Sequence, residues 1–228
     1  MLETNGFDII PSLFTAEEIA YLRFAISTGN LETHGARNLL RRVPAIREVA
    51  ICSKLLKLVE DVVGSNPFPV RGIFFDKTPE ANWKVAWHQD LTIAVTEKKD
   101  VPGFGPWSVK EGVVHVQPPI SVLEKMLTVR IHLDECGGDN GPLQVIPGSH
   151  LHGRLEPAVI ATWKRKGPII SCIAPEGGVL LMRPLLLHSS SSAKTPGHRR
   201  VVHIEYAAEK LVGELEWAEP FGRQQSSV

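Results

Sequence analysis

The sequence predicts a jelly roll or β-sandwich, with α-helices confined to the first 66 residues. After residue 67, about eight short runs rich in β-branched and aromatic residues are separated by Gly, Pro and Asn. Before residue 66, two segments carry apolar residues at helical spacing. The 228 residues, 43% apolar and 22% charged, suit one domain that buries about 70% of its unfolded surface.

Two helices are predicted in the N-terminal part of the chain. The first begins after a capping box formed by Thr15 and Glu18, and it ends at Gly29. The second has Pro44 in its first turn and ends at Gly64. We therefore expect residues 1–66 to form a helical buttress beside the β-rich part.

The β-rich part, residues 67–210, is predicted to form the jelly-roll core. Short apolar runs bounded by turn residues are typical of strands in such folds. The expected strands are residues 70–75, 84–88, 91–96, 128–134, 143–146, 169–174, 179–182 and 200–207.

Residues 97–124 are predicted to form a long loop, because Gly and Pro recur throughout them. Long loops in compact domains are usually functional or disordered. This one contains Trp107, His115 and Gln117, side chains that a flexible, solvent-exposed linker would not require. We expect a lid or a substrate wall, and the alternative is a packed surface flap.

Charge and composition exclude several kinds of partner. Twenty-five basic side chains balance twenty-five acidic ones, and the pI of about 7.1 leaves no basic field for nucleic acid or anionic lipid. No segment resembles a signal peptide or a membrane span. Cys52, Cys136 and Cys172 have no CxxC spacing, which predicts reduced thiols. The expectation is a cytoplasmic protein that binds neither nucleic acid nor membranes.

Two neighbouring residues and one distant residue form a candidate metal site. His88 and Asp90 are separated by one residue, and such residues point to the same face of an extended chain. His188 offers a second imidazole at the end of a predicted apolar strand over residues 185–187. Two histidines and one carboxylate leave three metal positions open, as in non-haem Fe(II) oxygenases. Three other histidines lie among loop residues and are expected to be exposed: His34, His152 and His198.

Alternation in the last predicted strand separates an apolar face from a polar one. Arg199, His203 and Glu205 share the polar face, whereas Arg200 faces away. Arginine recognises a carboxylate through two parallel hydrogen bonds and keeps its charge, so Arg199 suits a permanent anion anchor. The alternative is that Arg199 and Arg200 form a solvated strand edge.

Arg130 lies on the polar face of the strand predicted at residues 128–134. It would attract an anion, either a substrate or a cosubstrate, and the alternative is an ion pair with Asp134 or Glu205. By the same alternation, Phe75 is a candidate for the pocket wall. His203 is a candidate substrate contact, against the alternative of a satisfied core histidine.

Four ordered motifs resemble the phytanoyl-CoA dioxygenase family of Fe(II)/2-oxoglutarate oxygenases. They are the string WHQD at residues 87–90, the turn NGPLQVIPGSH at residues 140–150, His188, and Arg199 eleven residues after it. The resemblance covers about residues 70–207 and implies a double-stranded β-helix.

The resemblance also implies the roles of the site residues. Fe(II) would be bound by His88, Asp90 and His188, with O2 at a remaining metal position. 2-Oxoglutarate would chelate the iron while its far carboxylate pairs with Arg199 and the hydroxyl of Ser190. Because Asp90 fills the position that related halogenases leave open to chloride, hydroxylation is expected. A third candidate for binding 2-oxoglutarate is Arg130, where relatives often carry a large neutral side chain.

The predicted function is therefore an Fe(II)- and 2-oxoglutarate-dependent dioxygenase that hydroxylates a small organic substrate, one with a carboxylate if Arg130 faces the site. Two other classes stay open: a cupin-like metal enzyme that does not use 2-oxoglutarate, and a catalytically silent jelly-roll binding module. The spacing of Arg199 argues against the first, and the complete set of ligands argues against the second. The sequence does not determine the substrate or the oligomeric state.

Overall fold

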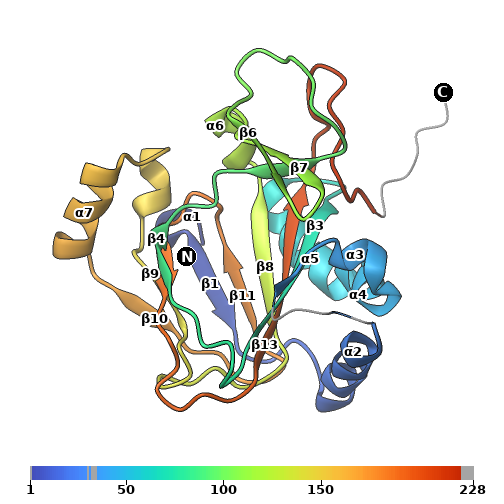
Figure 1. The fold of residues 1–228 in the computed structure, drawn as a ribbon, viewed down its shortest axis with the longest axis vertical. Helices are drawn as coiled ribbons and strands as arrows, with labels where there is room; N and C mark the ends of the chain where they lie inside the picture. Colours follow the sequence, from blue (N-terminus) through green and yellow to red (C-terminus); the bar gives the residue numbers. More distant parts are fainter. Residues whose placement is uncertain (1, 30, 32–34, 222–228) are drawn as a thin grey trace.

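Two antiparallel β-sheets face each other in the computed structural model, which describes residues 2–29, 31 and 35–221 (Figure 1). The larger sheet has the order β1-β11-β8-β13-β3-β2, and the smaller has the order β10-β9-β12-β4. In that order, the strands of the larger sheet are β1 (Phe7–Ile10), β11 (Val179–Met182), β8 (Leu127–His132), β13 (Arg199–Ala207), β3 (Phe68–Lys77) and β2 (Gly35–Ala36). Those of the smaller sheet are β10 (Ile170–Cys172), β9 (Leu143–Val145), β12 (His188–Ser190) and β4 (Val85–His88). The predicted jelly-roll class is confirmed.

A third, three-stranded sheet occupies much of the segment that was predicted to be an irregular loop. It consists of β5 (Ile93–Val95), β7 (Val113–Val116) and β6 (Trp107–Lys110) in that order. A tight turn at Glu111 and Gly112, both with positive φ, joins β6 to β7 as a hairpin. The short helix α6 (Ile120–Leu123) follows. The loop prediction was wrong for residues 107–110, 113–116 and 120–123, because Gly and Pro mark turns between strands as well as irregular chain, whereas β5 falls in the strand predicted at residues 91–96.

The first predicted helix is confirmed as α2 (Ala16–Thr28), with the capping box of Thr15 and Glu18 in place. The second is wrong as a single helix, because α4 (Pro44–Ala50) and α5 (Ser53–Val63) are separate. Ala50 and Leu55 are both fully buried, and in a continuous helix they would point about 140° apart. The break at residues 51 and 52 lets both contact the core.

Three predicted boundaries of the domain need correction. Strand β1 pairs with β11 at the edge of the larger sheet, so residues 1–66 are not a purely helical buttress. The N-terminal part also contains the short helices α1 (Leu2–Asn5) and α3 (Leu39–Arg42). Helix α7 (Pro157–Lys166) and the 3-10 helix η1 (Ser149–His152) interrupt the β-rich part. The core also continues past residue 210, since Trp217 is buried and forms a β-bridge with Val95.

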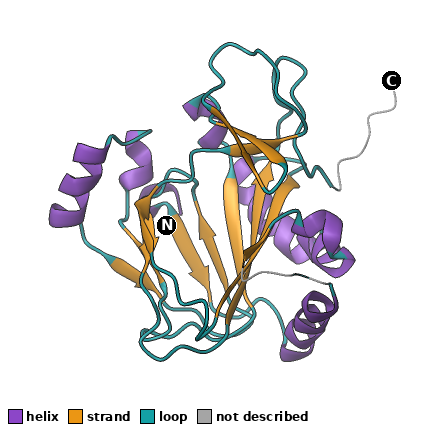
Figure 2. Cartoon of the chain, viewed as in Figure 1, coloured by secondary structure: helices purple, strands orange, loops and turns teal. Residues whose placement is uncertain are grey.

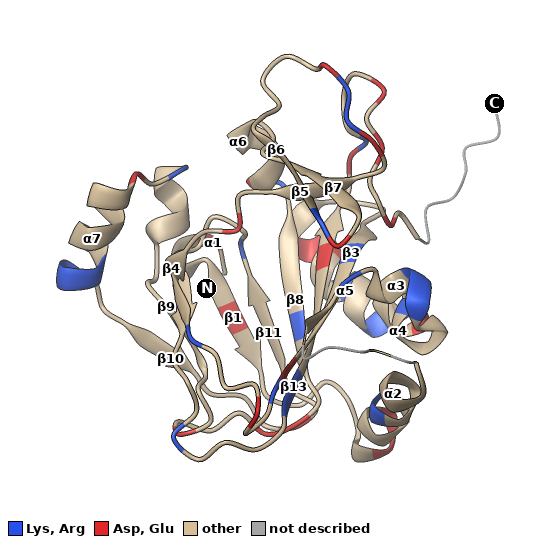
Figure 3. Cartoon of the chain, viewed as in Figure 1, with Lys and Arg blue, Asp and Glu red and all other residues tan. Residues whose placement is uncertain are grey.

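The larger sheet is apolar on its outer face and polar on the face toward the smaller sheet. Val202, Ile204 and Tyr206 of β13 pack with helices α2, α4 and α5, and the Tyr206 hydroxyl donates to the Ala50 carbonyl at 2.8 Å. These helices lie on one flank of the molecule, whereas α7 lies beside the smaller sheet on the other (Figure 2). Charged residues lie along β3, β8 and β13, inside the fold as well as on its surface (Figure 3). None of the helices in the described ranges is long and apolar enough to cross a bilayer.

Candidate active site

The candidate metal ligands come from two neighbouring strands of the smaller sheet. Strands β4 and β12 are antiparallel and place His188 directly opposite His88. Asp90 follows β4 and is fixed by a hydrogen bond from its backbone N–H to the Pro184 carbonyl at 2.9 Å. One ligand atom from each of the three side chains lies within 4.8 Å of the others. Residues 184–186 form a turn, so His188 begins a strand, contrary to the prediction that it ends one.

Backbone carbonyls fix the orientation of both histidine rings. The Nδ1 atoms of His88 and His188 lie 2.8 Å from the carbonyl oxygens of Ala86 and Leu186. Since a carbonyl only accepts, each Nδ1 carries the proton and each Nε2 presents its lone pair. Both Nε2 atoms lie 3.7 Å from an Asp90 oxygen. Two ligands about 2.1 Å from a shared metal lie roughly 3.0 to 3.6 Å apart, so the observed 3.7 Å is slightly wider and a small inward shift of the side chains would hold a divalent transition metal.

The protonation states of the candidate ligands also suit a metal. Burial by itself would raise the pKa of Asp90, but His188, His203, His88 and Arg71 outweigh it and hold the pKa at about 2. Burial lowers the pKa of His188 to about 4. At neutral pH the site therefore presents an ionised carboxylate and a neutral buried imidazole, which are the states that bind metals.

The three ligands line a cavity of about 190 Å³ between the two sheets. This volume is below the roughly 300 to 1,000 Å³ of typical ligand pockets, which favours compact ligands. Five other sequence-predicted residues line the same cavity: Phe75, Arg130, Ser190, Arg199 and His203. Three further lining residues were not predicted: Trp83, Val85 and Leu143. Trp83 lies in irregular chain before β4, where no strand period indicates the direction of its side chain.

Arg199 is buried, and no acidic side chain among the described residues forms an ion pair with it. Its Nη1 donates to the Gly141 carbonyl, and its Nε has no hydrogen-bond partner in the described part of the chain. Gly141 has φ +59°, and a Cβ there would lie 2.6 Å from the Ser191 carbonyl oxygen. The glycine of the NGPL turn is thus needed for the turn to approach β12 and reach Arg199. Arg200 points the other way and pairs with Asp134 at 2.7 Å, which confirms the predicted alternation.

Lys77 is a second buried cation in this region, and sequence reasoning missed it. Its side chain is almost fully buried, with Nζ 2.5 Å from the Ser191 carbonyl and 3.3 Å from the Ser190 hydroxyl. It lies opposite Arg199 in the pairing of β3 with β13. Burial, followed by the charge of Arg199, lowers the pKa of Lys77 to about 8. Extending the alternation that selected Phe75 by two residues would have found it.

Arg130 has neither of the ion pairs that formed its alternative interpretation. Its Nη1 donates to His203 Nδ1 at 3.0 Å, and its guanidinium lies 5.6 Å from the centre of the Phe75 ring. Asp134 pairs with Arg200, and Glu205 pairs with Arg71 at 2.9 Å. Burial lowers the pKa of Arg130 to about 10, so it remains charged at neutral pH.

Three predicted substrate residues do not line this cavity. Trp107 packs in the apolar cluster under the three-stranded sheet, and His115 is buried with Nδ1 bonded to the Val113 carbonyl at 2.9 Å. The backbone of Gln117 is bonded to the chain at residues 105 and 106. A contact between these side chains and a substrate therefore stays a prediction.

Of the histidines predicted to be exposed, His152 and His198 are exposed, and His34 lies outside the described residues.

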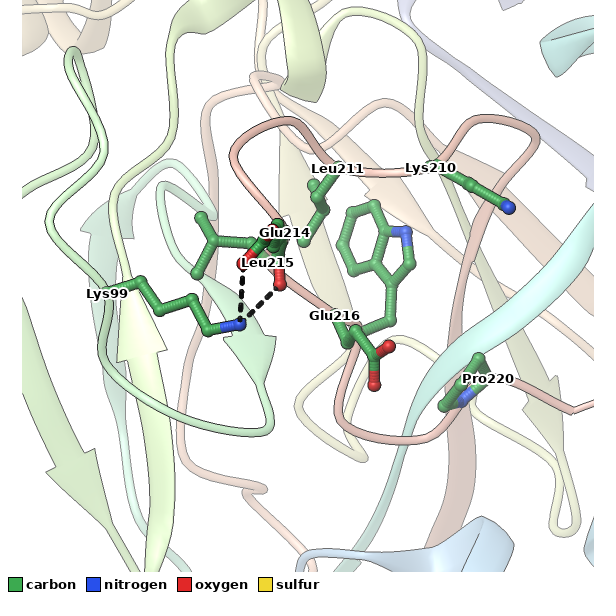
Figure 4. A pocket seen from close by; sticks show the side chains of 8 residues that line it. Lys99, Lys210, Leu211, Glu214, Leu215, Glu216 and Pro220 are labelled. Atoms are coloured by element: carbon green, nitrogen blue, oxygen red, sulfur yellow. Dashed lines mark hydrogen bonds and ion pairs between the residues drawn. The ribbon is translucent and has the colours of Figure 1, made fainter.

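A larger cavity, of about 650 Å³, lies away from the candidate ligands (Figure 4). It is formed where the chain around Lys99 meets the segment after β13, including Glu214 and Trp217. Lys99 Nζ donates to the Glu214 carbonyl at 2.8 Å, so its charged group belongs to the wall. No candidate ligand lines this cavity.

The fold and the site together define a class: a double-stranded β-helix with two histidines and one carboxylate at a cavity between its sheets. Residues 2–201 match the family model of phytanoyl-CoA dioxygenase. The chain belongs to the phytanoyl-CoA dioxygenase family.

Individual relatives are distant in sequence and similar in fold. The chain is 24% identical to peroxisomal phytanoyl-CoA dioxygenase of Mus musculus over 174 residues, 68% of this chain and 44% of the relative. It therefore spans less than half the length of that relative. Ectoine dioxygenase of Sphingopyxis alaskensis is 21% identical, with 96% of this chain and 76% of the relative covered.

Two solved structures illustrate the shared fold. The S. alaskensis enzyme EctD, with 2-oxoglutarate and 5-hydroxyectoine, superposes with a TM-score of 0.71 at 19% identity, covering 91% of this chain and 73% of that one. The alpha-ketoglutarate-dependent carbocyclase SnoK of nogalamycin biosynthesis has a TM-score of 0.70 at 15% identity, covering 90% and 80%.

Proposed function

We propose that this protein is an Fe(II)- and 2-oxoglutarate-dependent dioxygenase that hydroxylates a small organic substrate. The observation that carries the proposal is one cavity lined both by His88, Asp90 and His188 and by the unpaired, buried Arg199. A metal site alone would serve many reactions. A permanent cation beside it needs an anionic cosubstrate, because a buried charge is costly unless paired.

The residues present fit both groups. The two Nε2 lone pairs and the Asp90 carboxylate would hold Fe(II) on one face and leave the opposite positions open to ligands. Arg199 of the larger sheet and Ser190 of the smaller sheet both line the cavity, and together they would hold the far carboxylate of 2-oxoglutarate. When bound, Fe(II) and 2-oxoglutarate would activate O2 and supply the oxidation of a substrate C–H bond, with succinate and carbon dioxide as co-products.

The protein contributes position and exclusion of water. The carbonyls of Ala86 and Leu186 prevent ring rotation of the two histidines, so the ligand geometry exists before the metal binds. Trp83, Val85 and Leu143 give the cavity an apolar wall, which strengthens the pairing between Arg199 and an anion.

The test is formation of succinate from 2-oxoglutarate with Fe(II) under air, across a panel of metabolites. We expect activity in the wild type and none in His88→Ala or His188→Ala, with metal binding by calorimetry weakened at least tenfold. His152→Ala, an exposed histidine, is the matched control. Product formation without consumption of 2-oxoglutarate would indicate the cupin-like class, and metal binding without turnover would indicate a silent binding module.

We also propose a reducing compartment such as the cytoplasm as the place of action. Cys52, Cys136 and Cys172 are all free thiols, and two of them are buried. Free buried thiols are typical of proteins that function where disulfides do not persist.

A further inference from the structure

We propose that the substrate is a compact organic anion, a carboxylate or a phosphate, and that Arg130 binds its charged group. This inference rests on the proposed function, because it places the substrate in the cavity that holds the candidate metal ligands. Arg130 reaches that cavity from β8 of the larger sheet, across from the ligands on the smaller sheet.

The first observation is that Arg130 is buried and has no carboxylate partner. The two acidic residues that formed its alternative partners are engaged elsewhere, Asp134 by Arg200 outside the cavity and Glu205 by Arg71. Its Nε has no hydrogen-bond partner among the described residues. A buried guanidinium left in this state is costly, and an anion that enters the cavity would remove the cost.

The second observation is a chain of contacts that holds Arg130 in place without neutralising it. Arg71 pairs with Glu205 at 2.9 Å, and Glu205 Oε1 lies 3.4 Å from His203 Nε2. Because Arg130 can only donate, His203 Nδ1 accepts from it at 3.0 Å, and the ring proton lies on Nε2 toward Glu205. Arg71 and Glu205 cancel each other, so the full charge of Arg130 remains available.

The third observation is the balance of charge around the cavity. Arg130 and Arg199 are the two permanent cations among the described residues that line the cavity, and Asp90 is the one carboxylate among them. A bound Fe(II) ion adds two positive charges and 2-oxoglutarate adds two negative charges, so the assembled site would still carry one positive charge. The near carboxylate of 2-oxoglutarate is matched by the metal and the far one by Arg199. Arg130 is left for the substrate.

The chemistry of the guanidinium sets the class of group it would bind. Its planar fork offers two parallel N–H donors, the pattern that fits a carboxylate or a phosphate. The Phe75 ring covers one side of the fork, and the cavity of about 190 Å³ leaves room for a compact molecule. A neutral substrate of the same shape would leave Arg130 unpaired and bind less tightly.

Calorimetry of 2-oxoglutarate binding to the Mn(II)-loaded protein separates the cosubstrate from the substrate. We expect Arg130→Met to change the Kd for 2-oxoglutarate by less than threefold and Arg199→Met to raise it at least tenfold. Arg200→Met, which removes an arginine paired outside the cavity, is the control. A tenfold or greater loss in Arg130→Met would make Arg130 a cosubstrate anchor and overturn the inference. Absence of 2-oxoglutarate binding to the wild type would overturn the proposed function and this inference with it.

The anion itself is tested by thermal unfolding of the Mn(II)/2-oxoglutarate complex. Acetate and inorganic phosphate are compared with acetamide, a neutral molecule of the same shape as acetate, at equal ionic strength. We expect at least one anion to raise the Tm of the wild type and of Arg200→Met but not of Arg130→Met, with no effect of acetamide. The anion that acts identifies the group as carboxylate or phosphate. Equal responses of wild type and Arg130→Met, while 2-oxoglutarate still binds, would overturn this inference alone.

Unfolding of the ligand-free protein distinguishes a binding role from a structural one. Met is similar in length to the apolar stem of Arg and carries no charge. If Arg130 awaits a ligand, Arg130→Met leaves the Tm of the ligand-free protein unchanged or raises it. A lower Tm would show that Arg130 serves the fold and would overturn the inference.

Discussion

At the scale of single residues, buried cations rather than buried carboxylates distinguish this cavity. Arg199, Arg130 and Lys77 come from three adjacent strands of the larger sheet, and no acidic side chain in the described part of the chain forms an ion pair with any of them. Arginine holds its charge at any physiological pH, whereas the pKa of Lys77 lies at about 8. The two arginines are therefore permanent cations, whereas the charge of Lys77 can change near neutral pH.

The role of Arg199 gives a prediction that compares neighbouring residues. Arg199→Ala should weaken 2-oxoglutarate binding about tenfold to hundredfold, because a lost charge-assisted hydrogen bond costs about 1.5 to 3 kcal/mol. Metal binding should stay near the wild-type value, since Arg199 contacts none of the three candidate ligands. Arg200→Ala should do much less, because Arg200 pairs with Asp134 outside the cavity. Calorimetric titrations of metal and of 2-oxoglutarate measure both effects, and the opposite ranking would contradict the assignment.

His132 gives a prediction about stability and pH. Burial, followed by the charges of Arg130 and Arg199, lowers the pKa of His132 to about 3, and neither ring nitrogen has a partner in the described residues. The unfolded chain binds a proton near pH 6.5 and the folded chain does not, so the free energy of unfolding falls as pH drops from 6.5 toward 3. Between pH 6.5 and 5 this histidine should account for about 2 kcal/mol.

Urea unfolding at pH 7 and pH 5 measures that contribution. His132→Leu should lose less stability than the wild type over this interval, and His152→Ala, at an exposed position, should lose as much as the wild type. An unchanged pH dependence in His132→Leu would show that His132 has a partner or is protonated in the folded protein.

At the scale of secondary-structure elements, the alternation of side chains along strands predicted the residues of the cavity better than the length of apolar segments predicted the elements. The period of two in β13 and β8 placed Arg199 and Arg130 on the inner face and Arg200 outside, because each strand has one face against helices and the other toward the cavity. The break between α4 and α5 could not be predicted, since apolar spacing is nearly continuous through residues 44–63 and only packing on the sheet decides it. The three-residue strand β12 was missed because His188, Ser189 and Ser190 show no apolar alternation.

The hairpin of β6 and β7 lies in the segment that was predicted to be a lid, and we expect it to cover the cavity. Arg37 Nε pairs with Glu111 at the tip of the hairpin at 3.1 Å, which ties it to the chain after β2. Burial, followed by the charges of Arg71 and Arg37, lowers the pKa of Lys110 at the end of β6. We expect the hairpin to close further when the cavity is filled, because closure would exclude water from the reacting groups.

Limited trypsin digestion tests that closure at Lys110, which is exposed in β6. Cleavage there should be several times slower with Mn(II), 2-oxoglutarate and a substrate than in the ligand-free protein. Arg37→Ala should be cut faster than the wild type in the ligand-free state, because the hairpin tip loses its ion pair. Equal cleavage with and without ligands would show that the hairpin is a fixed wall.

At the scale of the whole molecule, the segment after β13 joins parts of the fold that the sheets leave separate. The backbone N–H groups of Thr96 and Ala218 bond to the carbonyls of Glu216 and Ala94, which attaches this segment to β5. A few residues on, the Glu219 carboxylate accepts from the backbone N–H groups of Gly72 in β3 and Arg41 in α3. The predicted end of the core at residue 210 omitted these contacts because polar residues and Gly213 interrupt the apolar pattern there.

Trp217 is the central apolar residue of that segment, and its removal should destabilise the whole fold. The side chain is buried in the cluster that includes Val95, Leu123 and Leu215, and its Nε1 donates to the Glu209 carbonyl at 3.1 Å. Replacing a buried Trp with Ala typically costs about 3 to 5 kcal/mol. We expect Trp217→Ala to lose about that much in urea unfolding and to keep one cooperative transition, because the same segment holds the three-stranded sheet to β3 and α3.

The exposed Val212 in the same segment is the matched control, and Val212→Ala should change stability by no more than about 0.5 kcal/mol. A second transition in Trp217→Ala would mean that the three-stranded sheet unfolds independently, and a loss below about 1 kcal/mol would mean that the segment lies on the surface of the core without supporting it.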